Sequence, residues 1–155
     1  MATAQAPMKI IDPASATDPS WLALRASLWP GGTAAEHLRY MADALARGHC
    51  VRLALGFDGR AAGFVEASRR VDYVNGTSTS PVAFLEGLYV VPSERRKGVA
   101  RMLVAEIERW ALAHGCSELA SDSPVENTTA HAAHLGLGFE ETERVVYFRR
   151  AVRGV

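Results

Sequence analysis

The segment that most constrains this chain is the junction between an apolar, strand-like run and a long amphipathic helix. The run ends at Val91, a basic turn follows over residues 92–98, and the helix extends from there to His114. Amide groups in the first turn of a helix have no acceptor within the helix, and they lie at the positive end of its dipole. A basic turn with Gly98 at the helix start, where backbone can approach a ligand closely, therefore predicts a site that holds a pyrophosphate.

The spacing within this turn excludes two common nucleotide sites. A dinucleotide fold needs GxGxxG after a strand and an acidic residue about twenty positions later, and a P-loop needs GxxxxGK followed by Ser or Thr. Neither pattern occurs; the chain has Arg95, two residues, Gly98, one residue and Ala100. Taken alone, this short pattern also fits an ordinary basic turn that begins a helix.

The pattern resembles the acetyl-CoA signature of the GCN5-related N-acetyltransferases, the GNAT superfamily, in which Arg or Gln, two residues, Gly, one residue and Gly or Ala surround the CoA pyrophosphate. A second CoA segment of that superfamily matches at Asn127, Ala130 and the pair Gly138 and Phe139, with His134 in place of a tyrosine. The resemblance implies that acetyl-CoA binds as cosubstrate to Asn127 and to the turn residues Arg95, Arg96, Lys97, Gly98, Val99, Ala100 and Arg101.

Longer matches in the loops point to one group within the superfamily. The segments at residues 29–31, 72–76, 80–87, 120–122 and 140–145 resemble aminoglycoside 6'-N-acetyltransferases, so that the likeness runs from about residue 8 to residue 150. It implies transfer of the acetyl group of acetyl-CoA to the 6'-amine of an aminoglycoside antibiotic, by direct attack in a ternary complex. The same chemistry on another small amine, such as a polyamine or a metabolite, and a non-enzymatic acetyl-CoA sensor are the alternatives.

Composition is consistent with one enzyme domain. With 155 residues, of which 48% are hydrophobic, the chain can build one well-buried core, and we expect a single domain over residues 8–152 after a loose tail at residues 1–7. Lys plus Arg and Asp plus Glu number 17 each, so no overall basic field favours nucleic acid or a membrane as partner. The start of the chain lacks signal-peptide features, and Cys50 and Cys116 are expected to be reduced core thiols in a cytoplasmic protein.

Periodicity and turn signals predict an α+β fold. Helices are expected over residues 18–28, 34–46, 98–114 and 127–136, and strands over residues 9–12, 50–57, 62–67, 82–91, 118–121 and 144–152, in a mostly antiparallel sheet. The resemblance implies that the central strand splays from its neighbour, so that the pantetheine of CoA pairs with the backbone of Leu88, Tyr89 and Val90. It also implies a homodimer, for which the apolar residues Val145, Val146, Tyr147 and Phe148 could pair with a partner's sheet.

Acetyl transfer to an amine requires the amine in its neutral form and held close to the thioester carbonyl, a task that suits carboxylates. Glu86 lies within the central strand and Asp122 just after the next one, although either could be an ordinary partnered surface acid. The resemblance implies that both contact the aminoglycoside. We expect Asp122 to be the base, acting directly or through water, and Glu86 to position the substrate.

Other site residues are implied with open alternatives. Trp29 and Tyr73 are expected to flank the sugar rings, although Trp29 could equally be a core residue, and Glu143 is expected to add an acidic contact. His134 could donate a proton to the departing CoA thiolate, or could be merely packed or exposed to solvent. His131 and His134 have metal-ligand spacing, but no third ligand accompanies them, so no metal is expected.

Overall fold

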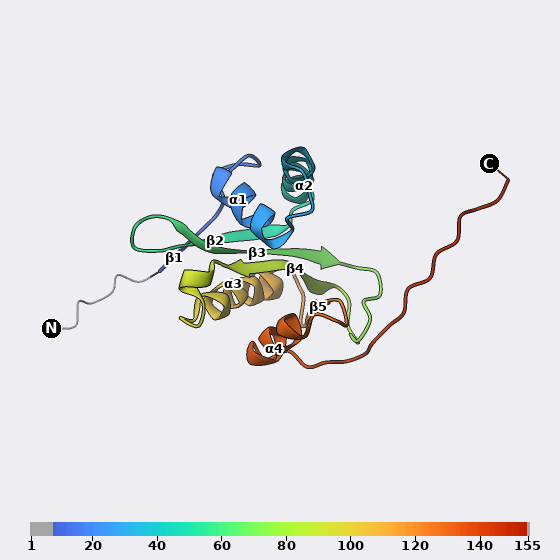
Figure 1. Ribbon diagram of the computed structural model, residues 1–155. Coiled ribbons are helices and arrows are strands. Elements are labelled where there is room, and N and C mark those ends of the chain that lie inside the picture. The colour runs from blue at the N-terminus through green and yellow to red at the C-terminus, as the bar shows by residue number, and fades with distance from the viewer. Residues whose placement is uncertain (1–7, 155) are drawn as a thin grey trace. The chain divides into compact units, whose positions relative to one another are not determined.

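The computed structural model describes residues 8–154 (Figure 1), and the predicted tail at residues 1–7 lies outside them. The chain divides into two compact units, of which one ends at Asp122 and the other begins at Ser123. Each unit is described by itself, and the single domain expected over residues 8–152 stays a prediction. No helix among residues 8–154 is long and apolar enough to cross a bilayer.

The first unit is built on one five-stranded sheet in the order β1-β2-β3-β4-β5. All neighbouring strands are antiparallel except β4 and β5, which run parallel. The α+β fold with a mostly antiparallel sheet is therefore confirmed. The strands are β1 (Lys9–Ile11), β2 (Cys50–Leu55), β3 (Ala61–Arg70), β4 (Val82–Val90) and β5 (Leu119–Ser121).

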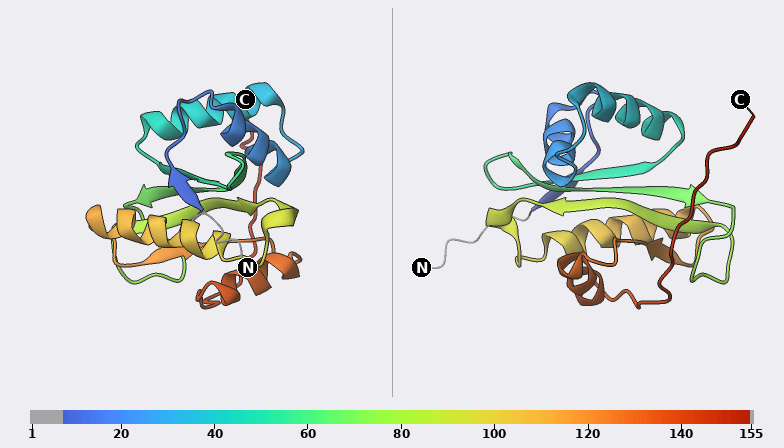
Figure 2. Two further views of the ribbon diagram at one scale, coloured as in Figure 1. Left: turned by 90° about the vertical axis from the view of Figure 1, so that its left-hand side faces the viewer. Right: turned by 45° about the vertical axis from the view of Figure 1, so that its right-hand side comes forward.

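Helices cover both faces of this sheet. Figures 1 and 2 show α1 (Pro19–Leu28) and α2 (Ala34–Ala46) over one face and α3 (Val99–Ala113) over the other. A buried cluster from α1, α2, β2 and β3 packs between the first two helices and the sheet. The apolar face of α3 packs against the opposite face. The cluster comprises Trp21, Leu24, Met41, Val51, Leu53 and Phe64, and the buried residues of α3 are Val99, Leu103, Val104, Ile107 and Ala111.

Local sequence explains where α1 and α2 begin. The Asp18 carboxylate accepts hydrogen bonds from the amides of Ser20 (2.9 Å) and Trp21 (3.1 Å) and so caps α1. Thr33 and Glu36 form a capping box at the start of α2, in which each side chain accepts from the other residue's backbone amide. Such caps satisfy first-turn amides, and both helices lie within one residue of their predicted bounds.

The second unit contains α4 (Thr128–Gly136), followed by residues 137–154 without helix or strand. The predicted terminal strand over residues 144–152 is therefore wrong for the single chain. Its large apolar residues are exposed, from 45% for Val145 to 93% for Phe148. Apolar and β-branched residues favour a strand only where a neighbouring strand completes the hydrogen bonds and covers one face, and among residues 8–154 this run pairs with none.

Candidate active site

The sheet opens where β4 and β5 stop pairing. Their parallel register ends at the pair Leu85 and Ser121, so Glu86 and Asp122 are the next residues on the two strands. Strand β4 continues to Val90 with no further strand on that side among residues 8–154. The backbone of Leu88, Tyr89 and Val90, which is expected to pair with pantetheine, thus lies on a sheet edge to which an extended ligand can add as a strand.

A bulge in β4 sets Glu86 apart from its neighbours. On β3, Glu66 pairs with Gly87 and Ala67 with Leu85, so Glu86 is the extra residue between two ladder positions. A bulge of this kind bends the strand and redirects the side chain that it carries. It explains why a carboxylate that follows four buried residues of β4 retains 21% exposure.

The Glu86 carboxylate has two partners on β3 that the sequence did not reveal. Ser68 Oγ donates to it at 2.5 Å and Arg70 Nη2 at 2.9 Å. The Arg70 guanidinium also lies 3.5 Å from the centroid of the Phe84 ring. Both partners bind Oε1, so a ligand ammonium can bind the carboxylate through Oε2 or compete with Arg70 for Oε1. The pocket around Glu86, of about 380 Å³, is lined by Tyr40, Asp43, Arg47, His49, Ser68, Arg69, Arg70 and Glu86.

Trp29 packs within the protein, and its expected contact with the sugar rings stays a prediction. It caps the C-terminus of α1, is half-buried, and meets the Phe64 ring edge to face at a centroid distance of 6.2 Å. Its indole also covers Gly87, where any Cβ would collide with Trp29 Cη2. The ring is thus packed against the core and against β4 at the residue after Glu86.

Tyr73 projects from the loop between β3 and β4 with 77% exposure. The residues that follow it anchor the loop. Val74 is buried against Val82 and Phe84, and the Glu118 carboxylate accepts from the amides of Ser78 (3.0 Å) and Thr79 (2.8 Å) and from the Thr79 hydroxyl. The bond from the Thr79 hydroxyl and those from the amides lower the pKa of Glu118. A fixed loop with an exposed aromatic ring can contact a sugar ring, and Asp122 is likewise exposed at the end of β5.

The strand–turn–helix junction forms as predicted. A 3₁₀ turn (Pro92–Glu94) leads into the exposed residues 95–98, and Arg95 Nε donates back to the Val90 carbonyl at 2.8 Å. Arg96 and Gly98 have positive φ, 61° and 84°. No side chain caps the N-terminus of α3 at Gly98, so the first-turn amides face the turn. Basic side chains and these amides together make a site for an anion.

Three predicted residues, Asn127, His134 and Glu143, lie in the second unit. The Asn127 side-chain oxygen accepts from the Ala130 amide at 3.0 Å and caps α4, which leaves the amide nitrogen as its donor toward a ligand. His134 Nδ1–H donates to the Ala130 carbonyl at 2.7 Å, so a proton for a thiolate would come from Nε2 of the doubly protonated ring. Glu143 is exposed in the segment without regular structure.

The features of the first unit lie in order along β4. The anion site follows the end of the strand at Val90, and Glu86 lies four residues, or about 13 Å, before it. A long ligand with an anionic end can therefore bind the turn, pair its middle with the strand edge, and present its other end to Glu86 and Asp122. A reactive acyl group at that end would meet an amine held by carboxylates.

Known proteins are similar in sequence and fold to most of this chain. The sequence profile of the Acetyltransferase (GNAT) family matches residues 19–139. Two relatives are named aminoglycoside N(6')-acetyltransferase type 1. The one from Acinetobacter haemolyticus is 48% identical over 143 residues, covering 92% of this chain and 98% of the relative, and the one from Serratia marcescens is 47% identical over 134 residues, covering 86% and 92%.

Solved structures agree with the sequence relatives. The aminoglycoside 6'-N-acetyltransferase AAC(6')-Ih from Acinetobacter baumannii superimposes with a TM-score of 0.89 at 45% identity, covering 94% of this chain and 99% of that one. AAC(6')-Iy in complex with the bisubstrate analogue CoA-S-monomethyl-acetylneamine gives 0.87 at 44% identity, covering 95% and 100%. The chain therefore belongs to the acetyltransferase (GNAT) family.

Proposed function

We propose that this protein transfers the acetyl group of acetyl-CoA to the 6'-amine of aminoglycoside antibiotics and so confers resistance to them. The observation that carries the proposal is the free edge of β4, which lies between an uncapped, basic helix start and two carboxylates where the sheet opens. The similarity to named aminoglycoside N(6')-acetyltransferases over more than four fifths of the chain supports the choice of substrate.

The residues divide the reaction between them. The turn at residues 95–101 holds the pyrophosphate, and Leu88 to Val90 pair with the pantetheine. Glu86, which Arg70 contacts at Oε1, binds a substrate ammonium. Asp122 accepts the proton that the attacking amine loses, directly or through water. A nitrogen–carbon bond forms and the carbon–sulfur bond breaks.

The leaving thiolate takes up a proton from solvent or from His134 Nε2. Trp29 and Tyr73 flank the sugar rings, Glu143 adds an acidic contact, and Asn127 donates to CoA. Several carboxylates in one site also attract a polycationic substrate.

A thiol-release assay with acetyl-CoA tests the substrate class. We expect turnover with aminoglycosides that carry a 6'-amine and none with matched aminoglycosides that carry a 6'-hydroxyl, because only the amine can attack. Spermidine serves as the small-amine comparison. Turnover with spermidine alone would assign the same chemistry to another substrate, and acetyl-CoA binding without any turnover would indicate a sensor. Growth of a susceptible strain that expresses the protein, with and without drug, tests resistance.

We also propose that the enzyme is a cytoplasmic homodimer. The run at residues 145–148 is exposed and apolar, with Tyr147 at 83% and Phe148 at 93% exposure, and an open apolar segment is stabilised by pairing with a second copy. Cys50 and Cys116 are buried and free, which fits a reducing compartment.

Light scattering at micromolar concentration is expected to give the mass of two chains. Replacing both Tyr147 and Phe148 with serine should give monomers, whereas replacing the exposed Leu112 of α3 with serine should leave the dimer intact. A wild-type protein that is monomeric at that concentration would contradict the proposal.

A further inference from the structure

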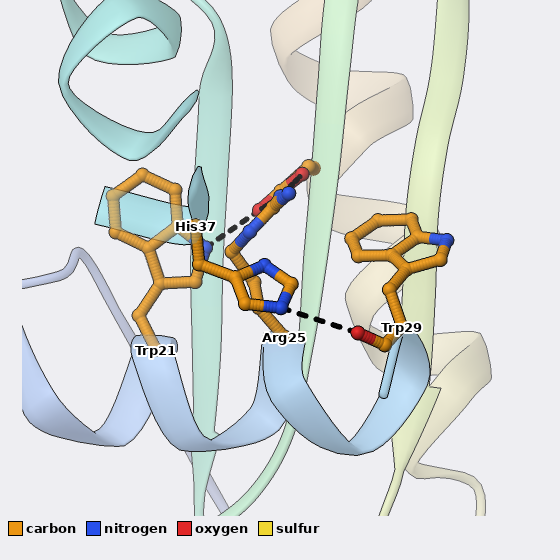
Figure 3. A network of polar contacts seen from close by, with 5 residues as sticks. Trp21, Arg25, Trp29 and His37 are labelled. Carbon is orange, nitrogen blue, oxygen red and sulfur yellow. Dashed lines mark hydrogen bonds and ion pairs between the residues drawn. The ribbon is translucent and has the colours of Figure 1, made fainter. Parts of the chain in front are cut away.

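The core between α1, α2 and β3 contains a charged pair that the reaction does not use. Arg25 Nη1 lies 2.5 Å from both carboxylate oxygens of Glu66, and their side chains are 6% and 0% exposed. Trp21 Nε1 donates to the same carboxylate at 2.6 Å. Figure 3 shows Trp21, Arg25 and Trp29 along α1, with Arg25 extending to the strand behind. Burial raises the pKa of Glu66, and the hydrogen bonds from Arg25 and Trp21 oppose that effect.

Stability alone does not explain this pair. Removing two charges from water costs several kcal/mol each, and apolar residues of similar size often replace a buried ion pair with no loss of stability. The same face of α1 already carries the large apolar side chains Trp21 and Leu24. A role that requires a fixed guanidinium therefore explains Arg25 better than a contribution to stability does.

The Arg25 guanidinium contacts two aromatic rings that border Glu86. Its central carbon lies 4.5 Å from the centroid of the Trp29 ring and 4.0 Å from that of Tyr40. Trp29 covers Gly87, the residue after Glu86, and Tyr40 lines the pocket that contains Glu86. Burial raises the pKa of Tyr40 to about 12, so its ring stays a neutral phenol. A planar cation between two rings favours one orientation of each.

The backbone of Trp29 is fixed as well. Its amide donates to the Arg25 carbonyl at 2.8 Å, and its own carbonyl accepts from His37 Nε2 at 3.2 Å (Figure 3). The Trp29 ring packs against Phe64 and Gly87, and the Arg25 guanidinium is the charged group that lies over it.

We propose that Arg25, held by Glu66, is a positioning residue that orients Trp29, which packs on the residue after Glu86, and Tyr40, which lines the pocket of Glu86, and thereby shapes the acceptor side of the active site. This inference rests on the proposed function, because it assigns these rings to the amine substrate and not to CoA. Neither Arg25 nor Glu66 touches the reacting atoms.

The test uses a neutral double variant, Arg25→Met with Glu66→Gln. It removes both charges together, avoids an unpaired buried charge, and keeps an acceptor for Trp21 Nε1–H. We expect the thermal unfolding temperature to stay near that of the wild type and KM for the aminoglycoside to rise about tenfold, because rings that are no longer held in one orientation bind the substrate less well. KM for acetyl-CoA should stay within about twofold, since the turn at residues 95–101 is unchanged. The control, Arg52→Met with Glu106→Gln, removes a partly exposed pair joining β2 and α3 at 4.0 Å, together with the contacts of Arg52 to Asp12 and of Glu106 to Arg109, and should change neither KM.

Arg25→Lys provides a second variant in case the double one fails to fold. Lysine keeps a positive charge beside Glu66 but lacks the planar guanidinium that stacks on the rings. KM for the aminoglycoside should therefore rise as in the double variant. Fluorine NMR of fluorotryptophan-labelled protein reports the geometry without any turnover. The Trp29 signal, assigned with Trp29→Phe, should shift or split in Arg25→Lys, while that of Trp110 on α3 stays in place.

The outcomes separate the two claims. Wild-type aminoglycoside KM in a folded double variant, or an equal rise in both KM values, would overturn the positioning role. A wild-type enzyme that acetylates no aminoglycoside would instead refute the proposed function, and the NMR result would still show whether Arg25 orients Trp29. An unchanged Trp29 signal in Arg25→Lys would overturn the inference whatever the substrate.

Discussion

Gly98→Val is expected to weaken acetyl-CoA binding by about a hundredfold or more, the effect of losing two hydrogen bonds from backbone amides to a charged group. Gly98 has φ 84°, and a Cβ there meets no protein atom within 4 Å. A β-branched side chain at this position both disfavours the turn conformation and occupies the space through which the pyrophosphate would reach the first-turn amides of α3. Isothermal titration calorimetry with acetyl-CoA measures the loss.

Gly115→Val is the matched control for this substitution. Gly115 follows the other end of α3, has φ 79°, and likewise has no atom within 4 Å of an added Cβ. Both variants should therefore lose a similar amount of stability from backbone strain, about 1–3 kcal/mol, measured by thermal unfolding. Only Gly98→Val should lose acetyl-CoA affinity. Near-wild-type affinity in a folded Gly98→Val protein would remove the turn from the CoA site.

Asp122→Asn is expected to lower kcat by about a hundredfold or more, because a positioned base contributes at least that much to proton transfer. The amide keeps the shape of the side chain but cannot take the proton. Acetyl-CoA affinity should change little, since CoA binds along β4 and the turn. Activity of the variant should rise with pH, because a larger fraction of the substrate amine is then already neutral. Steady-state kinetics with kanamycin-type substrates across pH measure both effects.

Two further variants define the role of Asp122. Asp58→Asn changes an exposed aspartate in the β2–β3 turn, where it accepts from the Arg60 amide, and should leave kcat and the pH profile unchanged. Glu86→Gln should mainly raise KM for the aminoglycoside, because Glu86 holds the substrate in the proposed mechanism. Wild-type turnover in Asp122→Asn would return the base role to Glu86 or to water.

The sequence by itself determined the features that depend on neighbouring residues. Asp18 and the pair Thr33 and Glu36 fix the starts of α1 and α2 through bonds that span at most three residues. The turn before α3 depends on its own glycine and basic side chains. For the same reason, the acetyl-CoA signature in that turn could be recognised before any fold was known, and the longer loop matches named the family that the comparisons then showed.

Only the tertiary structure decided how distant residues meet. The opening of the sheet at Glu86 and Asp122 depends on where two strands stop pairing, and the bulge that exposes Glu86 depends on its register with β3. Sequence reasoning noticed neither Arg70 beside Glu86 nor Arg25 with Glu66, although Arg25 lies four residues from both Trp21 and Trp29 on one helix face. Arg25 and Glu66 are 41 residues apart, and nothing local predicts such a pair.

The terminal run is a case in which local sequence predicted a strand that the structure does not form. Residues 144–152 have the composition of a strand, yet strand formation requires a partner edge, and within the described chain none adjoins it. Local composition sets what a segment prefers when a partner is present. Backbone pairing and the burial of charge depend on which strand or side chain lies next to a residue in the folded protein. For this chain, only the folded sheet and the helices that cover it bring those partners together.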